Sequence, residues 1–174
     1  MRKFIYLISP NKINKDFYKD LKKVLKYKKV AFLQLRLKNI NKKKILLISK
    51  KVKKITKHFN VKLIINDDLH TAILSKADGC HLGQNDGSIL EAKKKMSKKI
   101  VGVTCHNSKK LLLKGLSEKA DYLALGSFFR SKLKPKASRS NLKTLKWARS
   151  KIKKPLVAIG GINNKNYKAL LKAG

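Results

Sequence analysis

The sequence has few acidic residues, few cysteines and no long apolar run, and each shortage excludes a class of protein. Only 9 of its 174 residues are Asp or Glu, against 45 Lys and Arg, so the formal net charge is +36. Two cysteines, Cys80 and Cys105, are too few for a disulfide framework, and no CxxC pair indicates a zinc site. No apolar run reaches about 18 residues, which excludes a transmembrane helix. The first residues lack the long apolar stretch and cleavage site of a secretory signal, so we expect a cytoplasmic protein.

The large positive charge permits two interpretations. It would suit a nucleic acid or an anionic membrane as a partner. Such a surface usually clusters its cations and interleaves them with arginine and aromatic residues. Here lysine is spread from Lys3 to Lys172, and aromatic residues make up only 7% of the chain. We therefore interpret most lysines as solvated surface, expect no membrane partner, and keep a basic nucleic-acid-binding protein as the alternative.

Short apolar runs alternate with amphipathic, lysine-rich segments along the whole chain. The runs are nearly continuous, which is typical of parallel strands buried on both faces. We predict strands at 3–8, 30–36, 61–66, 77–82, 100–104, 121–126 and 155–160. We predict helices at 14–27, 41–59, 68–75, 88–96, 108–116, 141–150 and 164–172. Asn41 and Asn107 are the expected N-caps of two of these helices.

This order of elements, with no linker between them, predicts a single α/β domain over residues 1–174. Parallel strands joined by helices form either a doubly wound open sheet or a (βα)8 TIM-type barrel. No GxGxxG motif follows the first run, which disfavours a dinucleotide-binding sheet. Polar residues gather at the carboxyl ends of the runs, where a barrel places its active site. We therefore predict a (βα)8 TIM-type barrel, of which seven βα units can be recognised in this chain.

The second run ends in three polar side chains that alternate with leucine. Gln34, Arg36 and Lys38 are expected to point to one side of the strand, and Leu35 and Leu37 to the other. Three donors, two of them cationic, make an anion receptor, and the planar guanidinium suits phosphate oxygens. An ordinary charged strand end in a basic protein is the alternative.

Two of the scarce acids follow neighbouring runs. Asp67 comes directly after the third run, and Asp86 follows the fourth. Carboxylates beside a cationic cluster suit Mg²⁺ that bridges a polyphosphate. The alternative is helix capping, because Asp68 and Asp86 both precede helical segments. At the end of the seventh run, Gly160 and Gly161 would let backbone N–H groups approach a phosphate.

Six segments, taken together, resemble thiamine-phosphate synthase, a family of (βα)8-barrel enzymes. They are LQLRLK (33–38), LIINDD (63–68), ADGCHLGQND (77–86), IVGVTCHN (100–107), ADYLALGSFF (120–129) and PLVAIGGINNKN (155–166). They run in the family's order and cover nearly the whole chain. Because the family continues into an eighth strand and helix, the resemblance implies that the last βα unit of the barrel is absent from this chain. The resemblance implies a transferase of thiamine biosynthesis that joins an aminopyrimidine methyl diphosphate to a thiazole phosphate and releases pyrophosphate. It implies small-molecule substrates, and the oligomeric state stays open, a homo-oligomer included.

The resemblance also implies roles for individual residues. The implied substrate-binding residues are Gln34, Arg36, Lys38, Asn66, Thr104, Ser131, Lys134 and Gly161. Within this set, Arg36, Lys38 and Lys134 would be catalytic, because they would neutralise the departing diphosphate. Asp67 and Asp86 would hold Mg²⁺.

The chain departs from the family pattern after the sixth run. The family usually has Pro-Thr-x-Thr-Lys there, whereas this chain has Arg-Ser-Lys-Leu-Lys at 130–134. Ser131 can replace the first threonine, but Leu133 cannot supply a hydroxyl. Two relatives are therefore alternatives: a thiazole tautomerase, which generally lacks the Gln-x-Arg-x-Lys set and the carboxylate pair, and an inactive truncated member.

Overall fold

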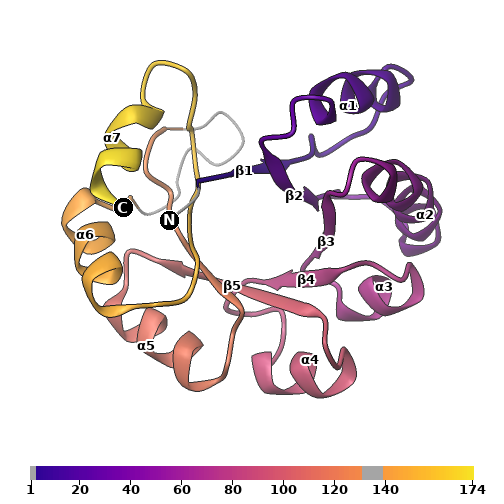
Figure 1. The fold of residues 1–174 in the computed structure, drawn as a ribbon. Helices are drawn as coiled ribbons and strands as arrows, with labels where there is room; N and C mark the ends of the chain where they lie inside the picture. The colour runs from indigo at the N-terminus through magenta and orange to yellow at the C-terminus, as the bar shows by residue number, and fades with distance from the viewer. Residues whose placement is uncertain (1–2, 131–138) are drawn as a thin grey trace. The chain divides into compact units, whose positions relative to one another are not determined.

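Strands and helices alternate along the chain in a computed structural model that describes residues 3–130 and 139–174 (Figure 1). The strands are β1 (Ile5–Ile8), β2 (Val30–Leu35), β3 (Lys62–Asn66), β4 (Gly79–Leu82), β5 (Ile100–His106), β6 (Tyr122–Leu125) and β7 (Leu156–Ala158). The helices are α1 (Phe17–Leu25), α2 (Lys42–His58), α3 (Leu69–Leu74), α4 (Ile89–Lys95), α5 (Lys109–Ser117), α6 (Leu142–Lys151) and α7 (Tyr167–Ala173). Each predicted element is present close to its expected boundaries.

The chain has two compact units, each with its own parallel strand pairs. The first comprises Met1–His81 and Lys94–Ile100, and the second comprises Leu82–Lys93 and Val101–Gly174. In the first unit β1 pairs with β2, β2 with β3, and β3 with β4. In the second unit β5 pairs with β6, and β6 with β7. Parallel pairs joined by helices confirm the predicted α/β alternation, and the expectation of a single domain stays a prediction.

The first and last strands of the sheet, β1 and β7, are less buried than strands between them such as β4 and β6. Every residue of β4 and of β6 is buried, as the continuous apolar runs predict. In contrast, β1 is half-buried or exposed and β7 is half-buried throughout, so the prediction of burial on both faces is wrong for these two strands. Among the described residues, each of the two has a strand neighbour on one side only, which leaves its side chains with fewer contacts.

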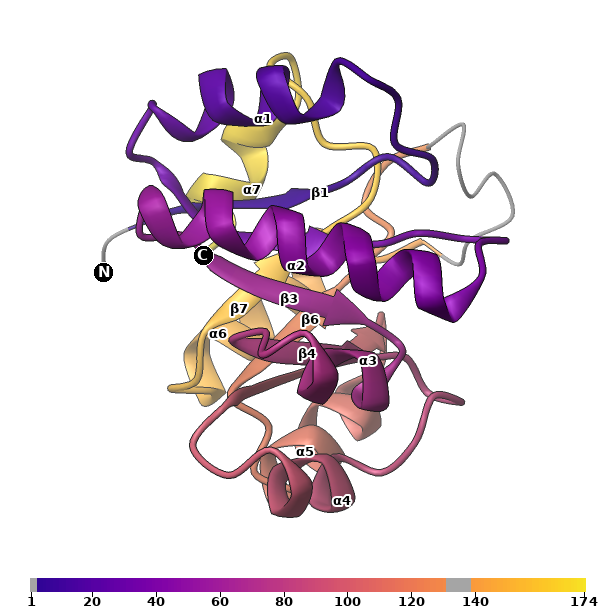
Figure 2. The same cartoon turned by 90° about the vertical axis from the view of Figure 1, so that its right-hand side faces the viewer.

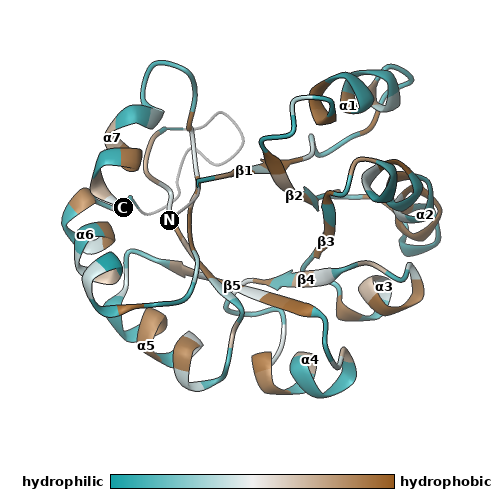
Figure 3. Cartoon of the chain, in the orientation of Figure 1, coloured by the Kyte–Doolittle hydropathy of each residue, from teal (hydrophilic) through white to brown (hydrophobic). Residues whose placement is uncertain are grey.

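Helix α2 shows how the lysine-rich segments fold. It lies along strand β3 (Figure 2) and buries Ile48, Ser49, Val52 and Thr56. Figure 3 shows hydrophilic and hydrophobic residues alternating around this helix. Full burial of one large aliphatic side chain contributes about 1.5–3 kcal/mol, so the apolar face holds the helix in place. Its lysines other than Lys53 stay exposed. The expected N-cap is confirmed, because Asn41 Oδ1 accepts a hydrogen bond of 2.8 Å from Lys43 N.

Helices α2, α3 and α5 end in the same way. The residue after each C-cap has a positive φ: 55° at Asn60, 54° at Lys76 and 63° at Lys119. The next residue is buried and donates its N–H to the carbonyl five positions earlier; these bonds are Val61 to Thr56 (2.8 Å), Ala77 to Ala72 (3.0 Å) and Ala120 to Gly115 (2.9 Å). This is the Schellman motif, which usually places glycine at the left-handed position. Two lysines occupy that position here.

An aspartate joins three elements immediately before β4. Asp78 Oδ2 accepts a hydrogen bond from Leu63 N at 2.7 Å and forms an ion pair with Lys53 Nζ at 2.6 Å. The pattern recurs before β6, where Asp121 accepts from Val101 N (2.7 Å) and Lys93 Nζ (2.9 Å). Both aspartates stand at the amino ends of strands, the end of a TIM-type barrel that serves stability rather than chemistry.

Within residues 3–130 and 139–174, no helix is both long enough and apolar enough to cross a membrane.

Candidate active site

Of the three polar residues predicted at the end of the second strand, Gln34 lies in β2, and Arg36 and Lys38 follow it. That their side chains share one side stays a prediction. We call Gln34, Arg36 and Lys38 the β2 receptor. Gln34 is 4% exposed, Arg36 is half-buried and Lys38 is exposed, so accessibility rises along the receptor from the interior to the solvent. The intervening Leu35 and Leu37 are buried. The receptor therefore has a buried base at Gln34, and its two cations come after the strand, which ends at Leu35.

Asp67 lies beside the receptor within the first unit. Lys38 Nζ is 2.6 Å from Asp67 Oδ2, and both side chains are partly exposed. Asp67 follows the last residue of β3, Asn66, and its φ is +64°. The segments that follow β2 and β3 thus bring one predicted cation, Lys38, and one predicted metal ligand, Asp67, together.

The neighbouring Asp68 has the capping role that the sequence left open. Its two carboxylate oxygens accept hydrogen bonds from Thr71 N at 3.0 Å and Thr71 Oγ1 at 2.9 Å, at the start of α3. Burial alone would raise the pKa of Asp68, but these hydrogen bonds and the attraction of Lys42 together lower that pKa. Asp67 and Asp68 are adjacent, yet one binds the receptor and the other caps a helix.

Asp86 does not cap the helix that follows it. Its exposed side chain turns back, and Oδ2 accepts a hydrogen bond of 2.8 Å from Gly83 N. At the start of α4 it is Ser88 Oγ that accepts a hydrogen bond, a long one of 3.4 Å from Glu91 N. The capping interpretation is therefore wrong for Asp86, and its proposed role as a metal ligand stays a prediction.

Thr104 is half-buried in strand β5 of the second unit. Its carbonyl oxygen accepts a hydrogen bond of 2.5 Å from Gln84 Nε2, which ties the loop carrying Asp86 to the end of β5. His106, the last residue of β5, has a φ of +51°.

The cap predicted at Asn107 is wrong. Ser108 Oγ accepts from Leu111 N at 3.2 Å and caps α5. Asn107 Oδ1 instead accepts from Ser140 Oγ at 3.1 Å and from Asn141 N at 3.2 Å, immediately before α6. A polar residue at a strand end can serve the next helix or a more distant one, and local spacing does not distinguish these partners.

Gly160 and Gly161 have φ values of +96° and +63°, which favour glycine. A Cβ at Gly161 would overlap the carbonyl oxygens of Phe129 and Arg130. Phe129 N also donates to Gly160 O at 3.0 Å. The glycines are therefore required for the close passage of the chain after β6, and phosphate binding at Gly161 stays a prediction. The predicted contacts of Ser131 and Lys134, and the effect of Leu133, lie outside the described residues.

The sequence reasoning missed two residues after strand β1. Ser9 Oγ accepts a hydrogen bond of 2.9 Å from Arg36 N, and Asn11 Oδ1 accepts one of 2.7 Å from Arg36 Nη1. Only their position in the sequence could have identified them. Ser9 and Asn11 follow the first strand, just as the predicted site residues follow the other strands.

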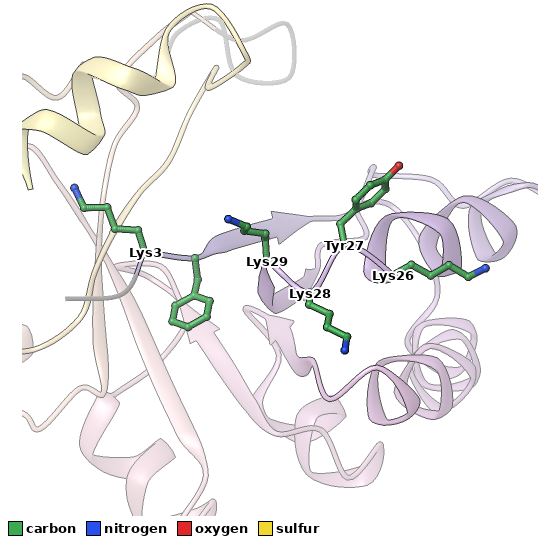
Figure 4. Close-up of a pocket in the computed structure, with 6 residues that line it drawn as sticks. Lys3, Lys26, Tyr27, Lys28 and Lys29 are labelled. Atoms are coloured by element: carbon green, nitrogen blue, oxygen red, sulfur yellow. The ribbon is translucent and has the colours of Figure 1, made fainter.

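A hollow of about 610 Å³ lies at the other end of the strands, before β1 and β2. It is lined by Lys3, Phe4, Lys26, Tyr27, Lys28 and Lys29. Figure 4 shows that its labelled side chains point in different directions rather than toward a common point. A ligand site needs convergent polar groups, so this hollow is not the candidate active site.

The cysteines are unsuited to nucleophilic chemistry. Cys80 and Cys105 are both buried and are not disulfide-bonded. Burial raises the pKa of the Cys105 thiol from 9.0 to about 12, and the thiolate is the reactive form. In the described part of the chain, no group of three or more His, Cys, Asp or Glu side chains converges to hold a metal ion. A site with one or two carboxylates, completed by substrate phosphate and water, is the arrangement typical of Mg²⁺.

Comparison with known proteins gives a consistent result. The family model described as thiamine monophosphate synthase matches residues 5–174. The chain is 51% identical to the thiamine-phosphate synthase of Pelagibacter ubique, over 98% of this chain and 83% of that protein. It is 36% identical to the thiamine-phosphate synthase of Erythrobacter litoralis, over 98% of this chain and 82% of that protein.

Solved structures agree with the sequence relatives. The thiamine phosphate pyrophosphorylase from Pyrococcus furiosus matches with a TM-score of 0.87 and 29% identity, over 99% of this chain and 81% of that one. A 3-hexulose-6-phosphate synthase, 17% identical with a TM-score of 0.70 over 97% of this chain and 86% of that one, shares the fold alone. The predicted TIM-type barrel class is confirmed, with seven βα units among the described residues. On the match to residues 5–174 and these identities, the chain belongs to the thiamine monophosphate synthase family.

Proposed function

We propose that this chain has thiamine-phosphate synthase activity. It would condense 4-amino-2-methyl-5-(diphosphooxymethyl)pyrimidine with a thiazole phosphate, giving thiamine phosphate and pyrophosphate in the cytoplasm. The observation that carries the proposal is the β2 receptor beside Asp67, with Lys38 Nζ 2.6 Å from the carboxylate, in a chain that matches the family over residues 5–174. The receptor supplies positive charge for a diphosphate.

The reaction needs no nucleophilic side chain. The C–O bond between the pyrimidine methylene and the diphosphate breaks, and the pyrophosphate leaves with the bonding electrons. The lone pair of the thiazole nitrogen then forms the new C–N bond. The enzyme must stabilise the negative charge that develops on the leaving group and hold the two substrates in line.

The residues divide these tasks. Arg36 offers a planar, permanently charged group for two phosphate oxygens, and Lys38 offers a compact ammonium at the rim. Gln34 would orient the diphosphate from the buried base of the receptor. The other proposed substrate contacts are Asn66 and Thr104 toward the pyrimidine, and Gly161, Ser131 and Lys134 toward the thiazole phosphate and the leaving group.

Asp67 and Asp86 would hold Mg²⁺. Carboxylate oxygens are the ligands that this ion prefers, and the Lys38 ammonium already lies against Asp67, so the position accepts a cation. When bound, Mg²⁺ would neutralise charge on the diphosphate. Lys38 would then exchange its carboxylate partner for a phosphate oxygen.

The test mixes both substrates with the intact chain and measures thiamine phosphate and pyrophosphate, with Mg²⁺ and with a chelator. We expect both products in equal amounts, only with Mg²⁺. Replacing Lys38 with Met should lower kcat/KM by about 10²-fold, the usual loss when one donor to a developing charge is removed. Lys54→Met, which removes the same charge from the exposed side of α2, is the matched control and should leave kcat/KM unchanged.

Three outcomes would contradict the proposal. A folded chain that releases no pyrophosphate is not a synthase, and thiazole isomerisation without condensation would favour the tautomerase alternative. Equal losses from Lys38→Met and Lys54→Met would show that total charge, rather than the receptor, matters. Salt-sensitive nucleic-acid binding that persists in Asp67→Ala/Asp86→Ala, with no synthase activity in the unmodified chain, would favour the nucleic-acid alternative.

A further inference from the structure

The segment after strand β1 runs beside the β2 receptor. Ser9 N donates to Gln34 O at 2.9 Å, and Lys38 N donates to Asn11 O at 3.4 Å. These main-chain bonds continue the parallel pairing of β1 and β2 beyond Ile8, the last residue of β1. Each of the three receptor residues is therefore tied to this segment through its backbone or its side chain.

The middle residue of the receptor has the most contacts with this segment. Ser9, which is 4% exposed, accepts from Arg36 N at 2.9 Å and donates its hydroxyl to Pro10 O at 3.1 Å. Asn11 Oδ1 accepts from Arg36 Nη1 at 2.7 Å. One contact holds the Arg36 backbone and the other holds its guanidinium, so the direction of the side chain is defined at both ends.

The group that holds the guanidinium is neutral. Lys38, Lys53 and Lys93 each pair with a carboxylate, at 2.6, 2.6 and 2.9 Å. In the part of the chain that the structure describes, Arg36 has an amide oxygen as its side-chain partner instead. A guanidinium carries five N–H donors, and an amide acceptor orients it without cancelling its charge. A carboxylate at this position would form a bidentate ion pair and compete with phosphate for the same donors.

We propose that Asn11, supported by Ser9, is a positioning residue that presets the Arg36 guanidinium for the diphosphate while leaving its full positive charge available. The inference rests on the proposed synthase function for the identity of the diphosphate. It adds that a neutral acceptor at position 11 is a requirement for diphosphate affinity. A donor held in place before the ligand arrives costs less entropy to use, which is why such an acceptor raises affinity.

The test measures binding of inorganic pyrophosphate with Mg²⁺ to the intact chain by calorimetry. Asn11→Ala should weaken binding about tenfold, the loss that corresponds to one hydrogen bond to a charged group. Asn11→Asp keeps the acceptor and the side-chain shape but adds a negative charge, and should weaken binding more than Asn11→Ala. In steady-state assays Asn11→Asp should raise the KM for the pyrimidine diphosphate and leave the KM for the thiazole phosphate unchanged.

A double-mutant cycle separates positioning from a general structural role. If Asn11 acts through Arg36, then adding Asn11→Ala to an Arg36→Met chain should change pyrophosphate affinity less than about twofold, because the two effects are coupled. Thermal unfolding of every variant shows that it is folded. The inference is overturned if Asn11→Asp binds pyrophosphate as tightly as the unmodified chain. It is also overturned if Asn11→Ala causes the same loss with and without Arg36.

The inference and the proposed function fail in different ways. An unmodified chain that binds pyrophosphate through Arg36 and Asn11 but makes no thiamine phosphate would remove the function and keep the inference. A chain that makes thiamine phosphate at the same rate and KM with Asn11→Asp would keep the function and remove the inference.

Discussion

Replacing Lys76 or Lys119 with glycine should stabilise the protein. Both lysines are exposed and occupy the left-handed position of a Schellman motif, with φ of 54° and 63°. Neither is in the core, so the substitution leaves the packing of the following residues, Ala77 and Ala120, in place. The hydrogen bonds that close the motif involve only backbone atoms, which glycine retains.

The size of the gain follows from two opposing terms. A residue with a Cβ pays about 1–2 kcal/mol for a left-handed conformation. Glycine lacks this cost, but it lowers the free energy of unfolding by about 0.4–1 kcal/mol, because it makes the unfolded chain more flexible. The net gain should be about 0.5–1 kcal/mol per site, which corresponds to about 1–4 °C in Tm for a chain of this size. Asn60→Gly should gain less, because asparagine already tolerates this conformation.

Urea unfolding, followed by circular dichroism, measures the change in the free energy of unfolding. Lys54→Gly is the matched control: it makes the same chemical change on the exposed side of helix α2 and removes the same charge. There the helix should lose about 1 kcal/mol. The reasoning is refuted if Lys76→Gly and Lys119→Gly lower the free energy of unfolding as Lys54→Gly does.

Three further changes test the description of the fold. Asp78→Asn should lower the free energy of unfolding by about 1–3 kcal/mol in urea titrations, because it breaks the partly buried pair with Lys53; equal stability would contradict this. Asp68→Ala should cost about 1 kcal/mol at neutral pH through loss of the α3 cap. Because the folded state lowers the pKa of Asp68, this difference should shrink as the pH falls below 3.8; a difference that grows as the pH falls below 3.8 would contradict the assignment. Burial raises the pKa of Cys105 from 9.0 to about 12, so the unfolded state ionises first and stability is lost as the pH rises above 9.0. Unfolding measured from pH 8 to 11 should therefore show a smaller decline for Cys105→Ala than for the unmodified chain, and parallel declines would disprove this.

The elements were predictable because their signals are local. Continuous apolar runs marked the strands, and the spacing of apolar residues marked the helices, as in α2 with Ile48 and Val52. The alternation of burial after β2 was predictable for the same reason, since Leu35 and Leu37 are buried while Arg36 and Lys38 are more accessible.

The partners of polar side chains were not predictable in the same way. Asn107 and Asn41 have similar sequence settings, yet Asn41 caps the next helix and Asn107 binds residues 33 and 34 positions away. Asp68 and Asp86 both precede helices, and only Asp68 is a cap. Which of several nearby donors a polar side chain binds depends on the tertiary structure. The spacing of residues in the sequence does not reveal it.

The contribution of Asn11 was missed for a related reason. It lies 25 positions from Arg36, and its neighbours give no sign of a polar role beyond a turn. If the polar residues after every predicted strand had been taken as site candidates, including those after the first strand, Asn11 would have been among them.

The two aspartate junctions before β4 and β6 have a consequence for how the chain folds during synthesis. Asp78 reaches partners 15 and 25 positions back, and Asp121 reaches partners 20 and 28 positions back. All of these partners precede the aspartate in the chain, so neither junction needs a residue that is synthesised later. Each junction can therefore close as soon as its own strand leaves the ribosome, without waiting for distant parts of the chain. In a nascent chain that carries so many positive charges, each junction would then supply an attractive ion pair between a lysine and an aspartate.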